Sequence, residues 1–231
     1  MRTKPSTLWL LTFIVSVTPV ALASTWYTDG AKGNDDNNCM SAQTACKTIG
    51  HAISLASSGD SIIVTTASYV ENLNVGKALK IVGSGAKATI LSANSPNLLV
   101  VQVTTNALLS KLTISSGKNS GVSNSGTLTM SNCIVTHNTA QRRYGISFGG
   151  GIINVGTLTI NNTIISANVA TGGAGIYSSG KVTIDRSTLS GNSGALGAGV
   201  LVNSEYRWRS RIAQSPGTSE TWAVASRAAL Q

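Results

Sequence analysis

Charged side chains are scarce in this sequence. Asp, Glu, Lys and Arg make up only 11% of its 231 residues, against about a quarter in ordinary soluble domains. This shortage argues against a helical bundle or coiled coil, and a hydrophobic content of 42% argues against disorder. Proline is also rare, at 4 residues, whereas glycine is frequent, at 24. The combination favours short strands joined by tight turns.

Acidic residues are the rarer charges, 8 against 17 basic ones, for a net charge of +9. Between Thr105 and Asn203 the only carboxylate is Asp185. A glycoside hydrolase needs paired carboxylates as general acid and base, and a calcium-dependent lyase needs several carboxylates with a basic residue. Because neither set is present, we predict no catalytic residue, no cofactor and no metal. Asp185 is most simply a turn residue that pairs with Arg186.

The excess of basic residues suits an acidic polysaccharide or an anionic cell surface as partner. Nucleic acid is a poorer fit, because the sequence has no basic stripe with interleaved aromatic residues.

The first 23 residues have the three parts of a secretory signal. Arg2 and Lys4 give a basic start, an apolar run extends from Leu8 to Val20, and Ala21-Leu22-Ala23 has the small residues of a cleavage site. A buried helix is the alternative. Spanning a bilayer takes about 20 apolar residues, and no segment supplies them. We therefore expect residues 1–23 to be a signal peptide. The mature chain would then be secreted, extracellular or in the cell envelope, without a transmembrane segment.

The three cysteines can be interpreted in this light. Cys39 and Cys46 lie seven residues apart in NNCMSAQTAC, and in an exported chain we expect them to form a disulfide, with two free thiols as the alternative. No other Cys or His is spaced to complete a metal site with them. Cys133 lies within a repeat and is expected to fill space in the core.

Internal repetition is the most informative feature of the sequence. Copies of one unit begin at Gly121 (GVSNSGTLTMSNCIVTHN), Gly151 (GIINVGTLTINNTIISAN), Gly175 (GIYSSGKVTIDRSTLSGN) and, in part, Gly199 (GVLVN). A weaker copy, SKLTISSG, begins at Ser110. The unit is about two dozen residues long, with one insertion from Gln141 to Phe148.

Alignment of the copies places like residues in columns. Within each copy apolar residues alternate with Thr, which is the period of a β-strand. A short polar pair then bends the chain, and an asparagine closes the copy. The apolar columns are Val122, Ile152, Ile176 and Val200; Leu112, Leu128, Leu158 and Val182; Ile114, Met130, Ile160 and Ile184; and Val135, Ile165 and Leu189. The closing asparagines are Asn138, Asn168 and Asn192. Such columns on rungs about 4.8 Å apart predict an all-β fold, a parallel β-solenoid.

A short helix is predicted over Lys47–Ser57, where apolar residues recur at helical spacing, and it would cap the first coil. Strand patterns follow at Ser61–Thr65, Tyr69–Val75 and Leu79–Val82. We expect residues 24–60 to form an N-terminal loop and capping helix, and residues 61–203 to form the solenoid.

The run from Lys47 to Gly85, KTIGHAISLASSGDSIIVTTASYVENLNVGKALKIVGSG, resembles the opening of exported right-handed parallel β-helix proteins of the pectin-lyase-like fold. The later GGGI and GAGI corners are similar to the repeats of polymorphic outer-membrane proteins. The resemblance implies a right-handed parallel β-helix, and we expect about six coils in this chain. It does not select a function, because that superfamily contains polysaccharide lyases, hydrolases, esterases and non-catalytic adhesins.

These observations favour a non-catalytic exported or cell-surface protein for adhesion or glycan binding. The alternative is a polysaccharide lyase or glycoside hydrolase that acts on acidic polysaccharide. The insertion carries Arg142, Arg143, Tyr144 and Phe148, whose cations and aromatic faces suit an acidic sugar chain. A solvated loop without a ligand is the simpler interpretation of the same residues.

The repeat stops in the middle of a copy. From Ser204 to Gln231 no strand alternation is sustained and no column continues. We predict that residues 204–231 are a non-repeat tail, disordered or out of frame, on a truncated piece of a longer β-helix. A native cap, with Trp208 and Trp222 as apolar lids, is the alternative.

Overall fold

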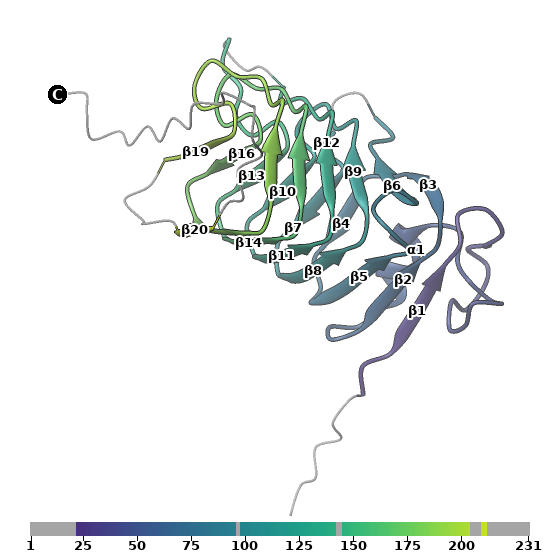
Figure 1. Ribbon diagram of the computed structural model, residues 1–231. Coiled ribbons are helices and arrows are strands. Elements are labelled where there is room, and N and C mark those ends of the chain that lie inside the picture. Colours follow the sequence, from purple (N-terminus) through teal and green to yellow (C-terminus); the bar gives the residue numbers. More distant parts are fainter. Residues whose placement is uncertain (1–21, 96–97, 142–144, 204–208, 212–231) are drawn as a thin grey trace, which may run out of the picture.

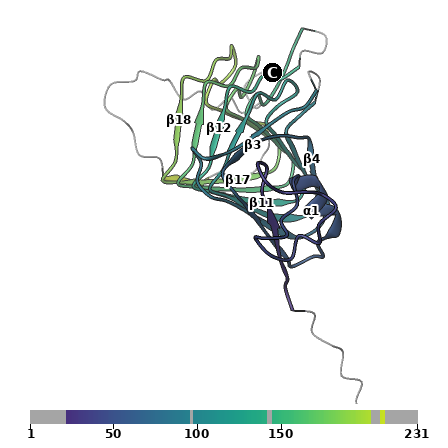
Figure 2. The same cartoon turned by 90° about the vertical axis from the view of Figure 1, so that its right-hand side faces the viewer.

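The computed structural model describes residues 22–95, 98–141, 145–203 and 209–211. Over these residues the chain is a right-handed parallel β-helix built from three sheets (Figures 1 and 2). Each coil adds one strand to sheet A, then one to sheet B, then one to sheet C. Sheet A contains β1 (Thr25–Thr28), β2 (Ser61–Val64), β5 (Leu79–Gly83), β8 (Asn106–Ser110), β11 (Thr127–Ser131), β14 (Thr157–Asn161), β17 (Lys181–Asp185) and β20 (Arg209–Arg211).

Sheets B and C complete each coil with short strands. Sheet B contains β3 (Ala67–Val70), β6 (Thr89–Ser92), β9 (Thr113–Ser115), β12 (Ile134–Thr136), β15 (Ile164–Ser166) and β18 (Thr188–Ser190). Sheet C contains β4 (Leu73–Val75), β7 (Val101–Val103), β10 (Val122–Asn124), β13 (Ile152–Asn154), β16 (Ile176–Ser178) and β19 (Val200–Val202). The three sheets enclose one aliphatic core.

The repeat columns predicted from the sequence are confirmed from β10 onward. Leu128 pairs with Leu158, which pairs with Val182, and all three side chains are buried. Val135, Ile165 and Leu189 form the matching column in sheet B. Alternation with period two is therefore what selects the inward face of each strand.

The register of the weaker copy at Ser110 was predicted wrongly. Lys111 has a left-handed φ of 56° and forms the corner between sheets A and B. Leu112 and Ile114 therefore lie beyond that corner, on the sheet B side, and not on the sheet A strand. The observed pairs are Ala107 with Leu128, Leu109 with Met130, and Ile114 with Val135. An alternating K-L-T-I run fits either side of a corner equally well, so alternation alone did not fix its place.

The corner between sheets A and B repeats the same backbone conformation in each copy. Its second residue is left-handed, with φ of 54° at Asn132, 49° at Asn162 and 44° at Arg186. Asparagine tolerates this conformation better than most residues, which explains the polar pair in the sequence repeat.

The closing asparagines form a buried ladder after sheet B. The Asn138 amide donates to Oδ1 of Asn168 at 3.0 Å, and the Asn168 amide donates to Oδ1 of Asn192 at 3.0 Å. Each amide nitrogen also donates to a backbone carbonyl of the preceding coil. The ladder therefore satisfies polar groups that the bend removes from the sheets.

The N-terminal end of the stack is covered by helix α1 (Ile49–Leu55), which lies against β1, β2 and β4 (Figures 1 and 2). Ile49, Ala52 and Ile53 are its buried residues. The predicted strand Tyr69–Val75 is in fact two strands, β3 and β4, in different sheets. Of the predicted tail, only Arg209–Arg211 are described, and this segment pairs with β17 as β20.

No described helix meets the length and hydropathy needed to cross a membrane.

Candidate functional site

Carboxylates in the described residues are concentrated at the N-terminal end of the molecule, in the cap and the first coil. Five of the six, all but Asp185, precede residue 72. Asp60, which is 4% exposed, accepts hydrogen bonds from Ser24 N (2.7 Å), Trp26 Nε1 (2.8 Å) and Ser57 N (2.8 Å). Burial disfavours its charge, but these hydrogen bonds and nearby Lys77 outweigh burial and lower the pKa of Asp60. Asp60 therefore joins β1 to the end of α1.

Two further carboxylates meet at the start of α1. Asp35 accepts hydrogen bonds from the backbone of Lys47 (2.8 Å) and Thr48 (2.9 Å), and Glu71 accepts from Ile49 N (3.0 Å) and Gly50 N (2.8 Å). Burial raises the pKa of Glu71, and the charge of Asp35 adds to this increase. Although these are paired acids, their oxygens are occupied by the first turn of a structural helix.

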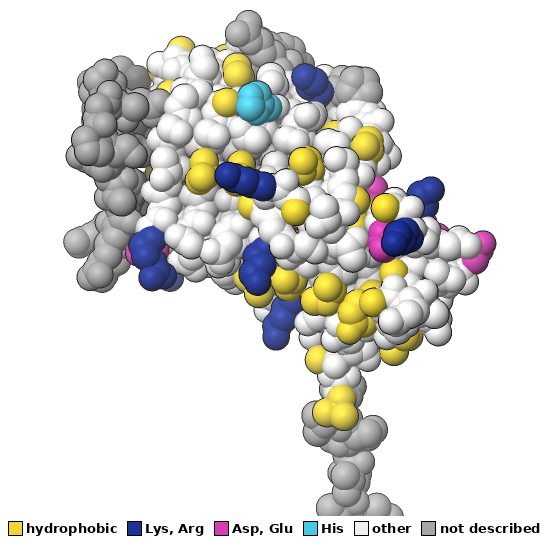
Figure 3. All heavy atoms as spheres, turned by 45° about the vertical axis from the view of Figure 1, so that its right-hand side comes forward, with side chains coloured by type: hydrophobic (Ala, Val, Ile, Leu, Met, Phe, Trp, Pro, Cys, Tyr) yellow, Lys and Arg dark blue, Asp and Glu magenta, His cyan; other side chains and the backbone are white. Residues whose placement is uncertain are grey.

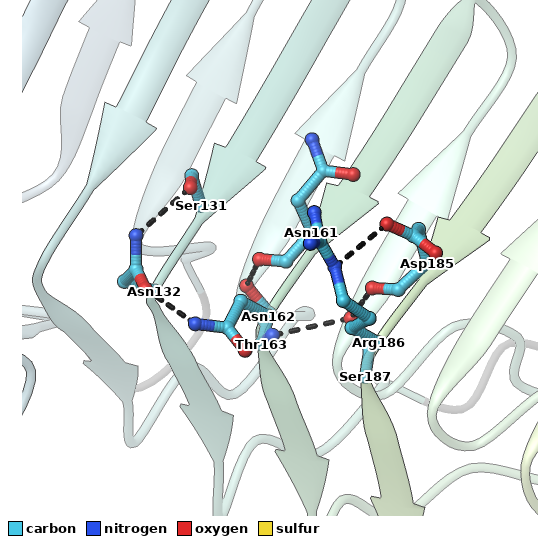
Figure 4. Close-up of polar contacts among 8 residues, drawn as sticks. All are labelled: Ser131, Asn132, Asn161, Asn162, Thr163, Asp185, Arg186 and Ser187. Atoms are coloured by element: carbon cyan, nitrogen blue, oxygen red, sulfur yellow. Dashed lines mark hydrogen bonds and ion pairs between the residues drawn. The ribbon is translucent and has the colours of Figure 1, made fainter. Parts of the chain in front are cut away.

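Asp185 is the last residue of β17, at the start of the corner, where Arg186 Nε is 2.9 Å from its Oδ2 (Figure 4). The preceding coils carry Ser131 with Asn132, and Asn161 with Asn162, at the same corner. Asn162 donates to Asn132 Oδ1 at 2.7 Å. Within the described part of the chain, this corner supplies one carboxylate and no second acid, so it lacks the pair that glycoside hydrolysis requires.

The predicted ligand-binding residues fall in the connection between sheets B and C. Arg142, Arg143 and Tyr144 lie outside the described residues. Phe148 is described and is 37% exposed. Its ring lies against that of Tyr177 on β16, with centroids 4.7 Å apart and planes tilted by 34°. This is a favourable geometry for two aromatic rings.

The outer face of sheet C forms a continuous column that includes Tyr177 of this aromatic pair. Its outward residues, one from each strand, are Asn74, Gln102, Ser123, Ile153, Tyr177 and Leu201. A Cβ added at Gly172 would lie 2.9 Å from the ring of Phe148 and 3.0 Å from Leu201, so only glycine leaves room for this packing. Asn203 donates to the Tyr177 hydroxyl at 3.1 Å. The face changes from exposed amides near the cap to aromatic and aliphatic groups farther along.

Tyr177 was missed at the sequence level. The signal was nevertheless present, because Ile176, Tyr177 and Ser178 alternate in the copy GIYSSG. Since Ile176 and Ser178 point inward, Tyr177 must point outward.

A hollow of about 280 Å³ lies on the outer face of sheet A. Lys80, Asn106, Leu108, Thr127 and Thr129 are among its lining residues. It contains no acid and no aromatic ring. The surface in Figure 3 is mainly uncharged, with acidic groups gathered at the capped end and a few scattered cations.

In the cap, Cys39 and Cys46 form a disulfide, with their Cα atoms 5.0 Å apart. Cys133 is buried with a free thiol, and burial raises its pKa to about 11. It therefore remains protonated and unreactive at neutral pH.

No family model matches the sequence, and no curated protein sequence matches it. Solved structures match the fold. A pectin methylesterase from Erwinia chrysanthemi has a TM-score of 0.53 at 13% identity, over 82% of this chain and 57% of that one. Pectin methylesterase from carrot has a TM-score of 0.57 at 13% identity, over 84% of this chain and 65% of that one. A pectin methylesterase in complex with a hexasaccharide has a TM-score of 0.55 at 12% identity, over 86% and 73%.

This chain thus spans a little more than half the length of the Erwinia enzyme. At these identities the likeness shows the fold, which is the right-handed parallel β-helix predicted from the sequence, and activity must be argued from the residues.

Proposed function

We propose that this chain recognises an acidic polysaccharide of the pectin type on the outer face of sheet C. The observation that carries the proposal is the aromatic pair of exposed Phe148 and partly exposed Tyr177, which lies toward the C-terminal end of a column of outward residues. Aromatic faces bind the apolar faces of sugar rings, and the amides of Asn74 and Gln102 can bond to hydroxyl or carboxylate groups farther along.

The insertion fits the same ligand. Phe148 ends the segment that also carries Arg142, Arg143 and Tyr144. The two arginines therefore lie, in sequence, in the connection that leads into sheet C. A carboxylate on each sugar would be attracted to them, because arginine pairs readily with carboxylates. The comparisons support this ligand class over adhesion, since the similar structures are of pectin methylesterases and one holds a hexasaccharide.

Binding can be measured by calorimetry with oligogalacturonides and with a neutral oligosaccharide. We expect Phe148→Ala and Tyr177→Ala each to weaken oligogalacturonide binding about tenfold, the loss of one stacking contact of about 1–1.5 kcal/mol. Thr159→Ala, on the outer face of sheet A, is the matched control and should leave the affinity unchanged. Unchanged affinity in both aromatic variants would contradict the assignment to sheet C.

The arginines are tested separately. Arg142→Ala together with Arg143→Ala should weaken binding and flatten its dependence on salt concentration. Undiminished binding would exclude these two arginines as ligand contacts and direct attention to the exposed Lys111, Lys118 and Lys181.

A second candidate function is a pectin-acting enzyme, which the structural matches favour. Asp185 beside Arg186 is the one carboxylate in the described coils that such a reaction could use. The purified chain should be incubated with methyl-esterified pectin while methanol release and chain cleavage are followed. Turnover that Asp185→Asn abolishes would establish this function. Binding without turnover supports a non-catalytic role.

Export is part of the proposal, because a polysaccharide ligand lies outside the cell. The basic start and Ala21-Leu22-Ala23 support it. N-terminal sequencing of the secreted chain should begin at Ser24.

A further inference from the structure

The cap brings His51 to the two cysteines, an arrangement that the sequence spacing did not indicate. A ligand atom of His51 and the sulfur atoms of Cys39 and Cys46 all lie within 4.8 Å of one another. Both cysteines are fully buried, whereas His51 is partly exposed. The three side chains come from a loop, the segment before α1, and the first turn of α1.

Backbone hydrogen bonds hold the two cysteines together independently of their disulfide. Tyr27 N donates to Cys39 O at 2.8 Å, and Cys46 N donates to Tyr27 O at 2.9 Å. Cys39 N donates to Thr44 O at 3.0 Å. Because β1 binds both cysteine backbones, breaking the S–S bond would leave two thiols side by side.

His51 is positioned by the start of the helix. Its backbone N–H donates to the side chain of the N-cap residue Thr48 at 3.2 Å. A further oxygen also faces the cysteines, since the Asn37 carbonyl lies 3.6 Å from Cys39 Sγ and 4.0 Å from Cys46 Sγ. Two thiolates and one imidazole are a ligand set that suits Zn²⁺, and water or the Asn37 carbonyl can take the fourth position.

We propose that Cys39, Cys46 and His51 form a zinc-binding site when the disulfide is reduced. An external thiol reductant breaks the S–S bond by supplying two electrons and two protons, and is itself oxidised to a disulfide. Zn²⁺ then displaces the two thiol protons and binds both sulfurs and the imidazole. The disulfide and the metal are alternative cross-links between the same two cysteines. Because both use the same sulfur atoms, reoxidation must release the ion.

The test uses the full chain in a Cys133→Ala background, which removes the only other thiol. Zn²⁺ alone is titrated by calorimetry into oxidised protein and into protein reduced with a phosphine. We expect one Zn²⁺ per reduced chain and none per oxidised chain. Zinc should also raise the melting temperature of the reduced form only. Equal binding to both forms, or no binding to the reduced form, would overturn the proposal.

The chain offers a matched control because it has two histidines. His51→Gln should lower the zinc affinity of the reduced form at least about tenfold, whereas His137→Gln, at an exposed corner, should leave it unchanged. His51→Gln leaves the disulfide intact, so circular dichroism of its oxidised form verifies folding independently. Equal zinc affinity in the two variants would exclude His51 as a ligand and refute the site. None of these measurements involves polysaccharide.

Discussion

The cap and the coils satisfy their buried polar groups by different means. The loops and α1 of the cap do not repeat, and single carboxylates accept hydrogen bonds from several of their N–H groups, as Asp60 and, from the first coil, Glu71 do. In the coils, the same task falls to neutral amides that repeat once per coil, as at Asn168. A repeated structure can use the same neutral amide in every coil, whereas the non-repeated cap uses charged carboxylates, each at its own place. Cap stability should therefore depend on pH, and coil stability should depend on packing and neutral hydrogen bonds.

The largest expected effect is in the coil core. Ile165 is fully buried on β15, and Ile165→Asp would place an unpaired charge between Val135 and Leu189. We expect a loss of more than about 5 kcal/mol in unfolding free energy, measured by denaturant titration, because apolar packing is lost and a charge is buried. The adjacent Ile164 is 43% exposed, so Ile164→Asp should cost under about 1 kcal/mol. Similar losses at both positions would contradict the register of β15.

The amide ladder should give the next effect. Asn168→Ala leaves buried partners on Asn138, Asn192 and Val135 without their hydrogen bonds. The expected cost is about 3 kcal/mol, with little change between pH 4 and 8 because no charge is involved. Asn162→Gly also removes an amide–amide bond, but from an exposed, left-handed corner that suits glycine, and should be nearly neutral. A strong pH dependence of the Asn168→Ala cost would contradict the claim that the coils, unlike the cap, rely on neutral hydrogen bonds.

In the cap, Asp60→Asn should lower the unfolding free energy at pH 7 by about 2 kcal/mol, because charged acceptors bind N–H groups more strongly. The folded pKa of Asp60 lies below its ordinary value of 3.8. Its contribution is therefore complete above about pH 4 and is lost as the pH falls through the lower, folded pKa. Thermal melts of both proteins from pH 2 to 7 should converge at the acid end. A constant difference across that range would show that the charge is not responsible.

Glu71 should give the smallest effect and the opposite sign. Its folded pKa is raised above 4.5, so the folded state holds the proton more tightly than the unfolded state. Stability from this group is present below pH 4.5 and declines as the pH rises through the folded pKa. Relative to the parent, Glu71→Gln should therefore gain stability between pH 4.5 and 7 in the same melts. A relative loss over that interval would mean that the hydrogen bonds from α1 outweigh burial.

The sequence predicted the repeated coils better than the cap. In the coils, one repeated alternation specifies the strands, the inward columns and the asparagine ladder, so the fold could be predicted. The register failed at Leu112, where the copy is weak and alternation fits either side of the corner. In the cap, the hydrogen bond of Asp35 with Thr48 and the proximity of His51 to Cys39 come from a structure that occurs once, so no repeat indicates them. The aromatic contact was half predicted, since Phe148 was singled out and Tyr177 was not.

The left-handed corner after sheet A has one further consequence. Lys111, Asn132, Asn162 and Arg186 all adopt this conformation, although glycine would do so at lower cost. An L-residue there costs roughly 1–2 kcal/mol relative to the right-handed conformation, yet these four successive coils each have a side chain at this point. Because the rungs are about 4.8 Å apart, these side chains stand at a fixed pitch along one edge of the molecule. Charge or length can be changed at any of them without altering the coil beneath. The corner is thus a row of exposed, variable side chains on a constant backbone, of which Asn132 and Asn162 also bond to each other.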